Sequence, residues 1–176
     1  YAIFFILGIE CLGKTYAKMN ETPQLNTHNK QEHPPMHTAE HILNGTMVKT
    51  FGCNRAKSAH IERKKSKCDY DFPRALSQQE IQDLEDKVNA IIAQDLPVTM
   101  EFAEQNDVAD RFDLNRLPDG ASQMVRIVHI GDYDQCLCVG THVEKTSQIG
   151  RFRISSTRFQ DDTLRIVFRL DEPNND

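Results

Sequence analysis

Two short stretches, far apart in the chain, constrain the fold more than any other feature of the sequence. His37 and His41 are four residues apart, and so are Cys138 and His142, about a hundred residues later. On a helix this spacing places both side chains on one face, where they can close on a single ion. Three imidazoles and one thiolate suit zinc, which accepts nitrogen and sulfur ligands in tetrahedral geometry. We therefore predict that the two pairs meet at one Zn²⁺ ion.

Size and charge limit the possible classes of protein. The chain has 176 residues and a mass of 20.2 kDa, enough for one domain with a sizeable core. A net charge of −5 argues against a protein that coats nucleic acid with its whole surface, but it allows a local basic face. Two groups of basic residues could form such a face or simply be solvated: Arg55, Lys57, Arg63, Lys64, Lys65 and Lys67, and Arg151, Arg153 and Arg158.

Cysteine usage and the first residues bear on the compartment. Five unevenly spaced cysteines predict no disulfide framework and favour a reducing, cytoplasmic location. The apolar run at residues 2–9 is too short to span a bilayer and lacks a basic flank, so we predict no membrane contact. We interpret residues 1–35 as a lead-in segment and hypothesise that the natural chain starts at Met19, so that residues 1–18 are not native. Residues 36–176 are then the predicted zinc-binding domain.

Hydrophobic periodicity predicts an α+β fold, with an antiparallel sheet packed against helices. The spacing of Leu43, Met47 and Phe51 predicts a helix from Met36 to about Phe51. A capping box at residues 77–80, followed by an apolar stripe, predicts a second helix that ends before Pro97. Strands are expected at residues 58–64, 67–72, 98–102 and 124–130, with two more alternating strands after Gly150. Helices and strands are segregated rather than alternating, which is typical of the α+β class.

One enzyme class shares part of the first motif. H-x-x-E-H is the inverted zincin pattern, in which Glu40 would act as the general base of a protease. That mechanism needs a carboxylate as third ligand and a long substrate cleft, and the chain supplies neither. It also leaves Cys138 and His142 without a role, so we do not favour it.

The motifs together resemble a known family. The segments that carry the resemblance are His37-Thr38-Ala39-Glu40-His41-Ile42-Leu43, Ser58-Ala59-His60-Ile61, Ile130-Gly131-Asp132 and Cys138-Val139-Gly140-Thr141-His142-Val143, followed by Thr146, Ile149-Gly150 and Phe152. They are similar to the editing domain of alanyl-tRNA synthetase, which also occurs in threonyl-tRNA synthetase and as the free-standing trans-editing proteins called AlaX. The resemblance covers residues 36–170, and the short chain is most similar to the free-standing form.

The resemblance implies an activity and a partner. The family's activity is zinc-dependent hydrolysis of the ester of a mischarged aminoacyl-tRNA, typically seryl- or glycyl-tRNA for alanine, which protects translation fidelity. His37, His41, Cys138 and His142 match its metal ligands. Thr38 and Ser58 match positions that carry pocket hydroxyls, although Thr38 could equally cap a helix and Ser58 lie on a strand surface. Gly140 is expected to permit close backbone approach, and Thr141 to orient His142; either could be structural.

Lys64 and Lys65 flank the pocket position Ser58 and are the residues we expect to contact tRNA phosphates. Three differences from the family pattern concern the accepted substrate. Val139 replaces a glycine, Cys136 stands at a position that is often acidic, and a glycine-rich segment before the motif is missing. A second interpretation remains open, in which the domain is a non-catalytic RNA- or protein-binding module with a closed, structural zinc site.

Overall fold

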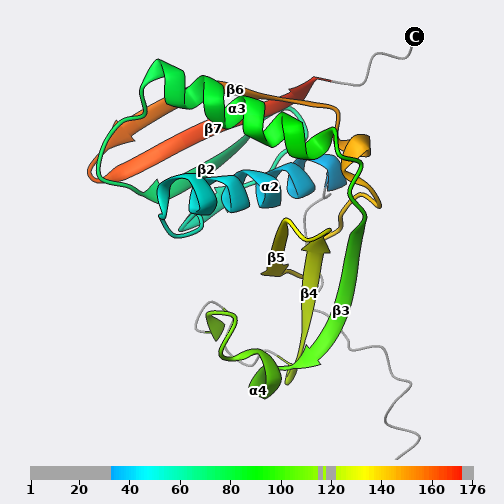
Figure 1. Ribbon diagram of the computed structural model, residues 1–176. Coiled ribbons are helices and arrows are strands. Elements are labelled where there is room, and N and C mark those ends of the chain that lie inside the picture. The colour runs from blue at the N-terminus through cyan, green and yellow to red at the C-terminus, as the bar shows by residue number, and fades with distance from the viewer. Residues whose placement is uncertain (1–32, 115–116, 118–121, 172–176) are drawn as a thin grey trace, which may run out of the picture.

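The computed structural model describes residues 33–114, 117 and 122–171, as helices α2–α4, strands β1–β7 and the 3₁₀ turn η3 (Figure 1). In chain order they are α2 (Pro34–Phe51), β1 (Ser58–His60), β2 (Ser66–Asp71), α3 (Gln78–Ile92), β3 (Val98–Glu104), α4 (Gln105–Val108), β4 (Met124–Ile130), β5 (Asp134–Leu137), η3 (Thr146–Ile149), β6 (Arg151–Gln160) and β7 (Thr163–Asp171). All strand pairs are antiparallel, which confirms the α+β prediction. The predictions about residues 1–18 and the start at Met19 lie outside the described residues.

A four-stranded sheet of order β1-β2-β7-β6 forms one layer of the molecule. Helices α2 and α3 run side by side across one face of this sheet (Figure 1). In β7 the alternation predicted from the sequence is confirmed, because Leu164, Ile166 and Phe168 are fully buried between sheet and helices. Phe152 of β6 stacks at 5.1 Å from Phe168, ring centroid to ring centroid. Most of the hydrophobic core therefore lies in this two-layered half.

Helix α2 begins two residues earlier than predicted. Pro34 and Pro35 occupy its first turn, where a missing N–H has no intrahelical partner to lose. The His33 side chain accepts a hydrogen bond from the Met36 backbone N–H and caps the helix. Gly52 ends it in the left-handed conformation, with φ of 66°. The helix is buried over most of its length, so it is a fixed support for the histidines that it carries.

The capping box predicted for α3 is confirmed. Ser77 accepts a hydrogen bond from the Glu80 backbone N–H, and the Glu80 carboxylate accepts one from the Ser77 backbone N–H. The predicted apolar stripe also faces the core, where Leu84, Val88 and Ile92 are buried.

A smaller, three-stranded sheet of order β3-β4-β5 extends away from the helix layer. One end lies beside α2 and the other carries α4, as Figure 1 shows. The sequence analysis did not predict α4 or β5, both of which are only four residues long. It also made β1 too long: the strand ends at His60, because Ser66 bonds the backbone N–H and carbonyl of Glu62 and closes the connection as a loop.

The small sheet is joined to α2 at the start of β5. A Cβ atom on Gly45 would lie 3.0 Å from Asp134 Oδ1, so glycine allows helix and strand to approach closely. Thr46 Oγ1 and Tyr133 Oη are 2.7 Å apart, and Lys49 Nζ donates to the Tyr133 carbonyl. Among the described residues, no helix is both long and apolar enough to cross a membrane.

Candidate metal centre

The first predicted ligand pair lies on α2, as its spacing led us to expect. His37 and His41 follow each other by one helical turn, with ring centroids 5.2 Å apart. His41 points toward the protein interior and is only 3% exposed, whereas His37 is partly exposed. Because α2 is fixed by its packing on the large sheet, these two nitrogen donors are positioned by regular structure.

The second pair is not helical, so the helical explanation of its spacing is wrong. Cys138 follows the end of β5, and His142 lies in the irregular segment that leads to η3. The Cys138 Sγ atom is 3.4 Å from His37 Nε2 and 3.5 Å from His142 Nε2. The irregular segment therefore bends back and presents its thiol and imidazole to α2.

The structure brings all four predicted ligands together. One donor atom each from His37, His41, Cys138 and His142 lies within 4.8 Å of the other three. The His142 ring is also close to both helix histidines, with centroid separations of 4.3 and 4.6 Å. Three nitrogens and one sulfur at this separation form a donor set of the kind that transition metals, and zinc in particular, bind.

Thr38 fixes the position and tautomer of His142. Its hydroxyl donates to the Pro34 carbonyl at 2.9 Å and accepts from the Val143 backbone N–H at 3.2 Å. His142 Nδ1 lies 3.1 Å from the same oxygen. Since the single hydroxyl proton points to Pro34, the Nδ1 nitrogen must carry the proton of this contact. The lone pair of His142 is then on Nε2, the nitrogen nearest the Cys138 sulfur.

His41 shows that the cluster suits a metal ion. Its Nδ1 atom is buried without a hydrogen-bond partner among the described residues, and its Nε2 atom lies 3.9 Å from Glu40 Oε2. A buried imidazole without hydrogen bonds is unfavourable, and metal coordination at one nitrogen would compensate. Burial lowers the pKa of His41 well below its ordinary value, and the nearby His142 and His37 lower it further. The ring is therefore neutral at pH 7, the form that binds metals.

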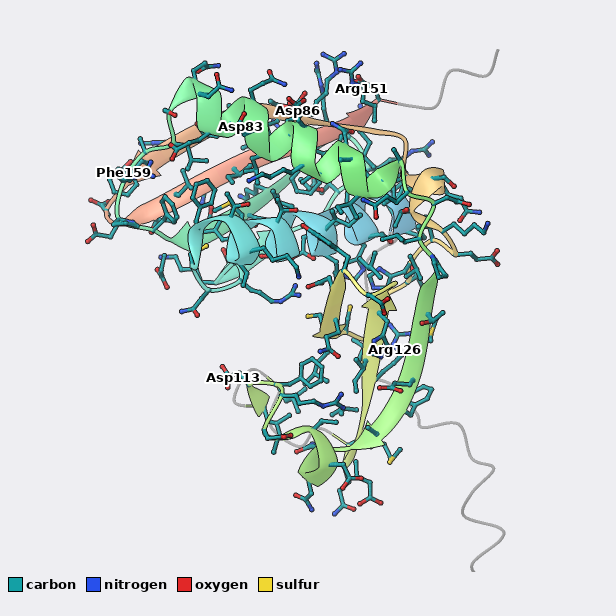
Figure 2. The ribbon with its side chains drawn as sticks, viewed as in Figure 1. Asp83, Asp86, Asp113, Arg126, Arg151 and Phe159 are labelled. Atoms are coloured by element: carbon teal, nitrogen blue, oxygen red, sulfur yellow. The ribbon has the colours of Figure 1, made fainter. Side chains whose placement is uncertain are left out.

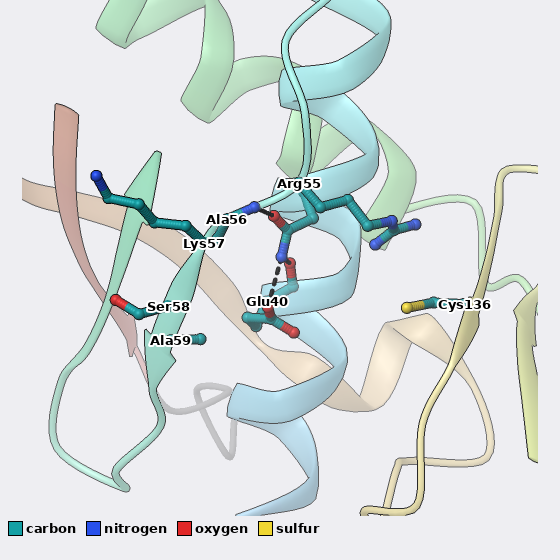
Figure 3. Close-up of a pocket in the computed structure, with 8 residues that line it drawn as sticks. Glu40, Arg55, Ala56, Lys57, Ser58, Ala59 and Cys136 are labelled. Carbon is teal, nitrogen blue, oxygen red and sulfur yellow. Dashed lines mark hydrogen bonds between the residues drawn. The ribbon is translucent and has the colours of Figure 1, made fainter. Parts of the chain in front are cut away.

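A cavity of about 210 Å³ adjoins the cluster, between α2, the start of β1 and the end of β5 (Figure 3). Its lining residues are Glu40, Asn44, Arg55, Ala56, Lys57, Ser58, Ala59 and Cys136. Asn44 organises it from α2: the amide donates to Glu40 Oε1 at 2.5 Å and accepts from the Ala56 backbone N–H at 2.8 Å. The same two segments contribute to the cavity and to the cluster: α2 carries Glu40 and His41, and Cys136 at the end of β5 is followed two residues later by Cys138.

The charged groups around the cavity are partly neutralised. Arg55 pairs with Asp134 at the start of β5, although burial raises the pKa of that carboxyl. Burial also raises the pKa of the Cys136 thiol to about 11, so it is protonated at pH 7. The family often has an acidic residue at position 136. This chain instead has an uncharged thiol there.

The other predicted site residues lie in different surroundings. Ser58 lines the cavity and donates to Asp69 Oδ2 at 3.2 Å. Gly140 is buried beside the cluster, and its backbone N–H contacts Cys138 Sγ at 3.4 Å, whereas the neighbouring Thr141 is exposed. Thr38 contacts His142 and does not line the cavity.

Lys64 and Lys65 are exposed in the loop between β1 and β2. Two other members of their basic group are neutralised by ion pairs: Lys57 pairs with Asp71, and Arg55 pairs with Asp134.

Fold and site together define an α+β domain in which a His₃Cys cluster lies next to a small cavity. The family model of the threonyl and alanyl tRNA synthetase second additional domain matches residues 125–167, which include Cys138 and His142. Similar curated proteins are alanine–tRNA ligases. That of Caldicellulosiruptor saccharolyticus is 34% identical over 143 residues, and that of Halorubrum lacusprofundi is 31% identical over 139 residues. These alignments cover 80% and 75% of this chain.

The chain belongs to the alanyl-tRNA synthetase editing-domain family, as the motifs led us to expect. It spans only 15% of the length of these two relatives, so it corresponds to a small part of each. The alanine–tRNA ligase of Methanococcus vannielii gives the same picture, with 29% identity over 82% of this chain and 17% of the relative.

Sequence reasoning missed two supporting residues. Asn44 was one of several polar residues on α2, and nothing in its spacing distinguished it. Arg126 had a detectable signal, because it interrupts an otherwise apolar run in β4, where a charge is unusual.

Proposed function

We propose that this domain is a zinc-dependent deacylase that hydrolyses the ester of mischarged aminoacyl-tRNA in trans, in the cytoplasm. Seryl- and glycyl-tRNA for alanine are the first substrates to test. The observation that carries the proposal is the convergence of four metal-binding side chains within 4.8 Å, beside a cavity, in a chain of this family. An aminoacyl ester needs little activation, so a small site without a nucleophilic triad is sufficient.

The ligands of the ion would be His37, His41, Cys138 and His142. When bound, zinc supplies Lewis-acid polarisation of an ester carbonyl and acidification of water. The protein's own contribution is to hold the donor groups in place. Thr38 keeps the His142 Nε2 lone pair available, and the buried, neutral His41 needs no deprotonation at pH 7.

The cavity would bind the amino-acid part of the substrate. Glu40 places a carboxylate on its wall, which suits the α-ammonium group that every aminoacyl ester carries. Ser58 offers a hydroxyl that could bond the side chain of a seryl group, and alanine would lack that partner. Cys136, as a neutral thiol, would bring no second negative charge to the ester.

Lys64 and Lys65 would contact tRNA phosphates, because they are exposed on a loop at the edge of the cavity-lining strand. We expect Lys64→Ala with Lys65→Ala to weaken tRNA binding and to flatten its log–log salt dependence by about 0.7–0.9 for each phosphate that is no longer neutralised. Hydrolysis of saturating substrate should change little. Arg151→Ala with Arg153→Ala removes the same charge from β6. If only that second double variant weakens binding, the RNA face is there instead.

The direct test is deacylation of a panel of mischarged tRNAs, with correctly charged alanyl-tRNA as reference and with and without a chelator. Loss of hydrolysis in Cys138→Ala, but not in Cys53→Ala, would tie the activity to the cluster. Cys53 is a matched control because it is also a cysteine in a partly exposed position. An active chelator-treated protein would contradict the zinc requirement.

One observation favours the second candidate, a binding module with a structural zinc. The cluster already offers four protein donors, which is a complete tetrahedral set, whereas catalytic sites usually keep one position open. That candidate predicts stoichiometric zinc and a metal-dependent melting temperature with no deacylation of any tRNA in the panel.

A further inference from the structure

Arg126 is a charged side chain in the interior of β4, where it is only 8% exposed (Figure 2). Its neighbours on both sides, Val125 and Ile127, belong to the small hydrophobic core. Among the described residues no carboxylate pairs with its guanidinium, whose contacts are all with neutral groups. Burying a charge without an opposite charge costs free energy, so the hydrogen bonds of the guanidinium must offset the cost of removing it from water.

Those hydrogen bonds converge on the segment that carries Cys138 and His142. Arg126 Nε donates to the Cys138 carbonyl at 2.7 Å, and Nη2 donates to the Gly140 carbonyl. A third nitrogen, Nη1, lies 3.7 Å from Met100 Sδ on the neighbouring β3. The planar fork therefore holds two carbonyls, two residues apart, on either side of Val139.

The position of Arg126 in the sheet explains why it is the residue that does this. β5 ends at Leu137, which pairs with Ile127, and one more backbone bond follows, from the Cys138 N–H to the Arg126 carbonyl. Beyond that bond the backbone turns away from the sheet, and the Arg126 side chain supplies the next donors in place of a strand. The irregular path from Cys138 to His142 is thus fixed from β4.

We infer that Arg126 is a positioning residue for the metal centre: its guanidinium fork presets the Cys138 thiol and, through Gly140, the path to His142. The inference rests on the proposed zinc centre. Outer groups that hold metal ligands in place commonly contribute about 10- to 100-fold to metal affinity.

The charge of Arg126 has the opposite effect. A guanidinium near the cluster repels a divalent cation, so a purely electrostatic role would make zinc bind more tightly once the charge is removed. In Arg126→Met, loss of the hydrogen-bonding fork should weaken zinc binding, whereas loss of the positive charge should strengthen it. Arg126→Lys separates them further, because it keeps the charge and loses the fork.

The experiment measures zinc affinity by competition with a chromophoric chelator, and the visible absorption of the Co²⁺-substituted protein. We expect Arg126→Met and Arg126→Lys to bind zinc about 10- to 100-fold more weakly than wild type and to shift the Co²⁺ spectrum. Arg153→Met should match the wild type, since it removes an arginine that pairs with Asp171 on the large sheet. Circular dichroism of the zinc-saturated variants checks the fold.

Every other outcome overturns the inference. Unchanged or tighter zinc binding by folded Arg126→Met would show that the fork does not position the ligands, and unchanged binding by Arg126→Lys would make charge the relevant property. If neither variant folds when saturated with zinc, Arg126 is a general determinant of the fold. A wild-type chain that takes up neither zinc nor cobalt would refute the metal centre itself, which deacylation assays with and without chelator detect separately.

Discussion

The two halves of the His₃Cys cluster have the same spacing in sequence and entirely different structural supports. His37 and His41 lie on α2, a regular helix that is held in place by its backbone hydrogen bonds and its buried face. Cys138 and His142 lie on irregular backbone, held by the Arg126 side chain and by the Thr38 hydroxyl. One half is positioned by secondary structure and the other by a few side-chain hydrogen bonds.

The difference shows where the centre is vulnerable. A buried helix loses little order when one contact is removed, because its hydrogen bonds and packing are distributed along its length. An irregular segment depends on each of its few bonds, so it is expected to be ordered jointly by its hydrogen bonds and by the ion. The following predictions test this asymmetry, beginning with the largest effect.

Metal removal should affect the two halves unequally. We expect a chelator to reduce deacylation at least about a hundredfold, to lower the melting temperature, and to increase amide hydrogen exchange in residues 138–143 far more than in α2. The physical reason is that the ion bonds the irregular segment to a helix that is otherwise anchored in the core. Exchange measured by mass spectrometry, with and without zinc, provides the comparison.

His37→Ala and Cys138→Ala sharpen the same test, since each removes one ligand from a different half. Both variants should lose stoichiometric zinc. Their amide hydrogen exchange should therefore resemble that of the chelator-treated wild type, with α2 still protected. Equal loss of protection in α2 and in residues 138–143 would show that the helix also depends on the ion, and the asymmetry would be refuted.

A smaller effect is expected from Thr38→Val, which keeps the shape of the side chain and removes its hydroxyl. His142 Nδ1 and the Val143 backbone N–H lose their acceptor, and unpaired buried groups cost about 1–3 kcal/mol each. Zinc affinity should fall about tenfold or more, because the tautomer and orientation of His142 are no longer fixed. Thr38→Ser is the matched control and should retain near wild-type affinity. Equal affinities in the two variants would exclude this role.

The sequence was sufficient for the helix half of the site and insufficient for the other half. The four-residue spacing of Leu43, Met47 and Phe51 specifies a helix, so His37 and His41 could be placed on one helical face from the sequence. The same spacing in residues 138–142 has no such meaning, because the backbone there follows a side chain on β4, and that contact is not encoded locally. The family motif predicted which four side chains cluster, but not what holds them in place.

The same distinction applies to the fold. Long amphipathic segments such as α3 and β7 were predicted correctly, since their periodicity is carried by many residues. β5 and α4 were missed because four residues give too short a pattern. The cavity could not be predicted either, because Glu40, Asn44 and Cys136 meet through tertiary packing.

The smallest expected effect concerns α3, which lies in the regular half and has its own anchor. Arg74 donates to Glu80 at 2.7 Å and the Ser77 backbone N–H to the same carboxylate at 2.8 Å, and these bonds lower the pKa of Glu80 to about 2. A carboxyl whose pKa is lowered by folding stabilises the native state fully above its unfolded pKa, near 4.5, and this contribution is lost as the pH falls toward 2.

Glu80→Gln should therefore melt slightly below wild type at pH 7, with the difference vanishing near pH 2. Loss of zinc ligands to protonation is common to both proteins and cancels in the difference. Zinc affinity at pH 7 should be the same in wild type and Glu80→Gln, because the capping box of Ser77 and Glu80 does not contact the His₃Cys cluster. A weaker zinc site in Glu80→Gln would mean that the helix layer and the metal centre are coupled after all.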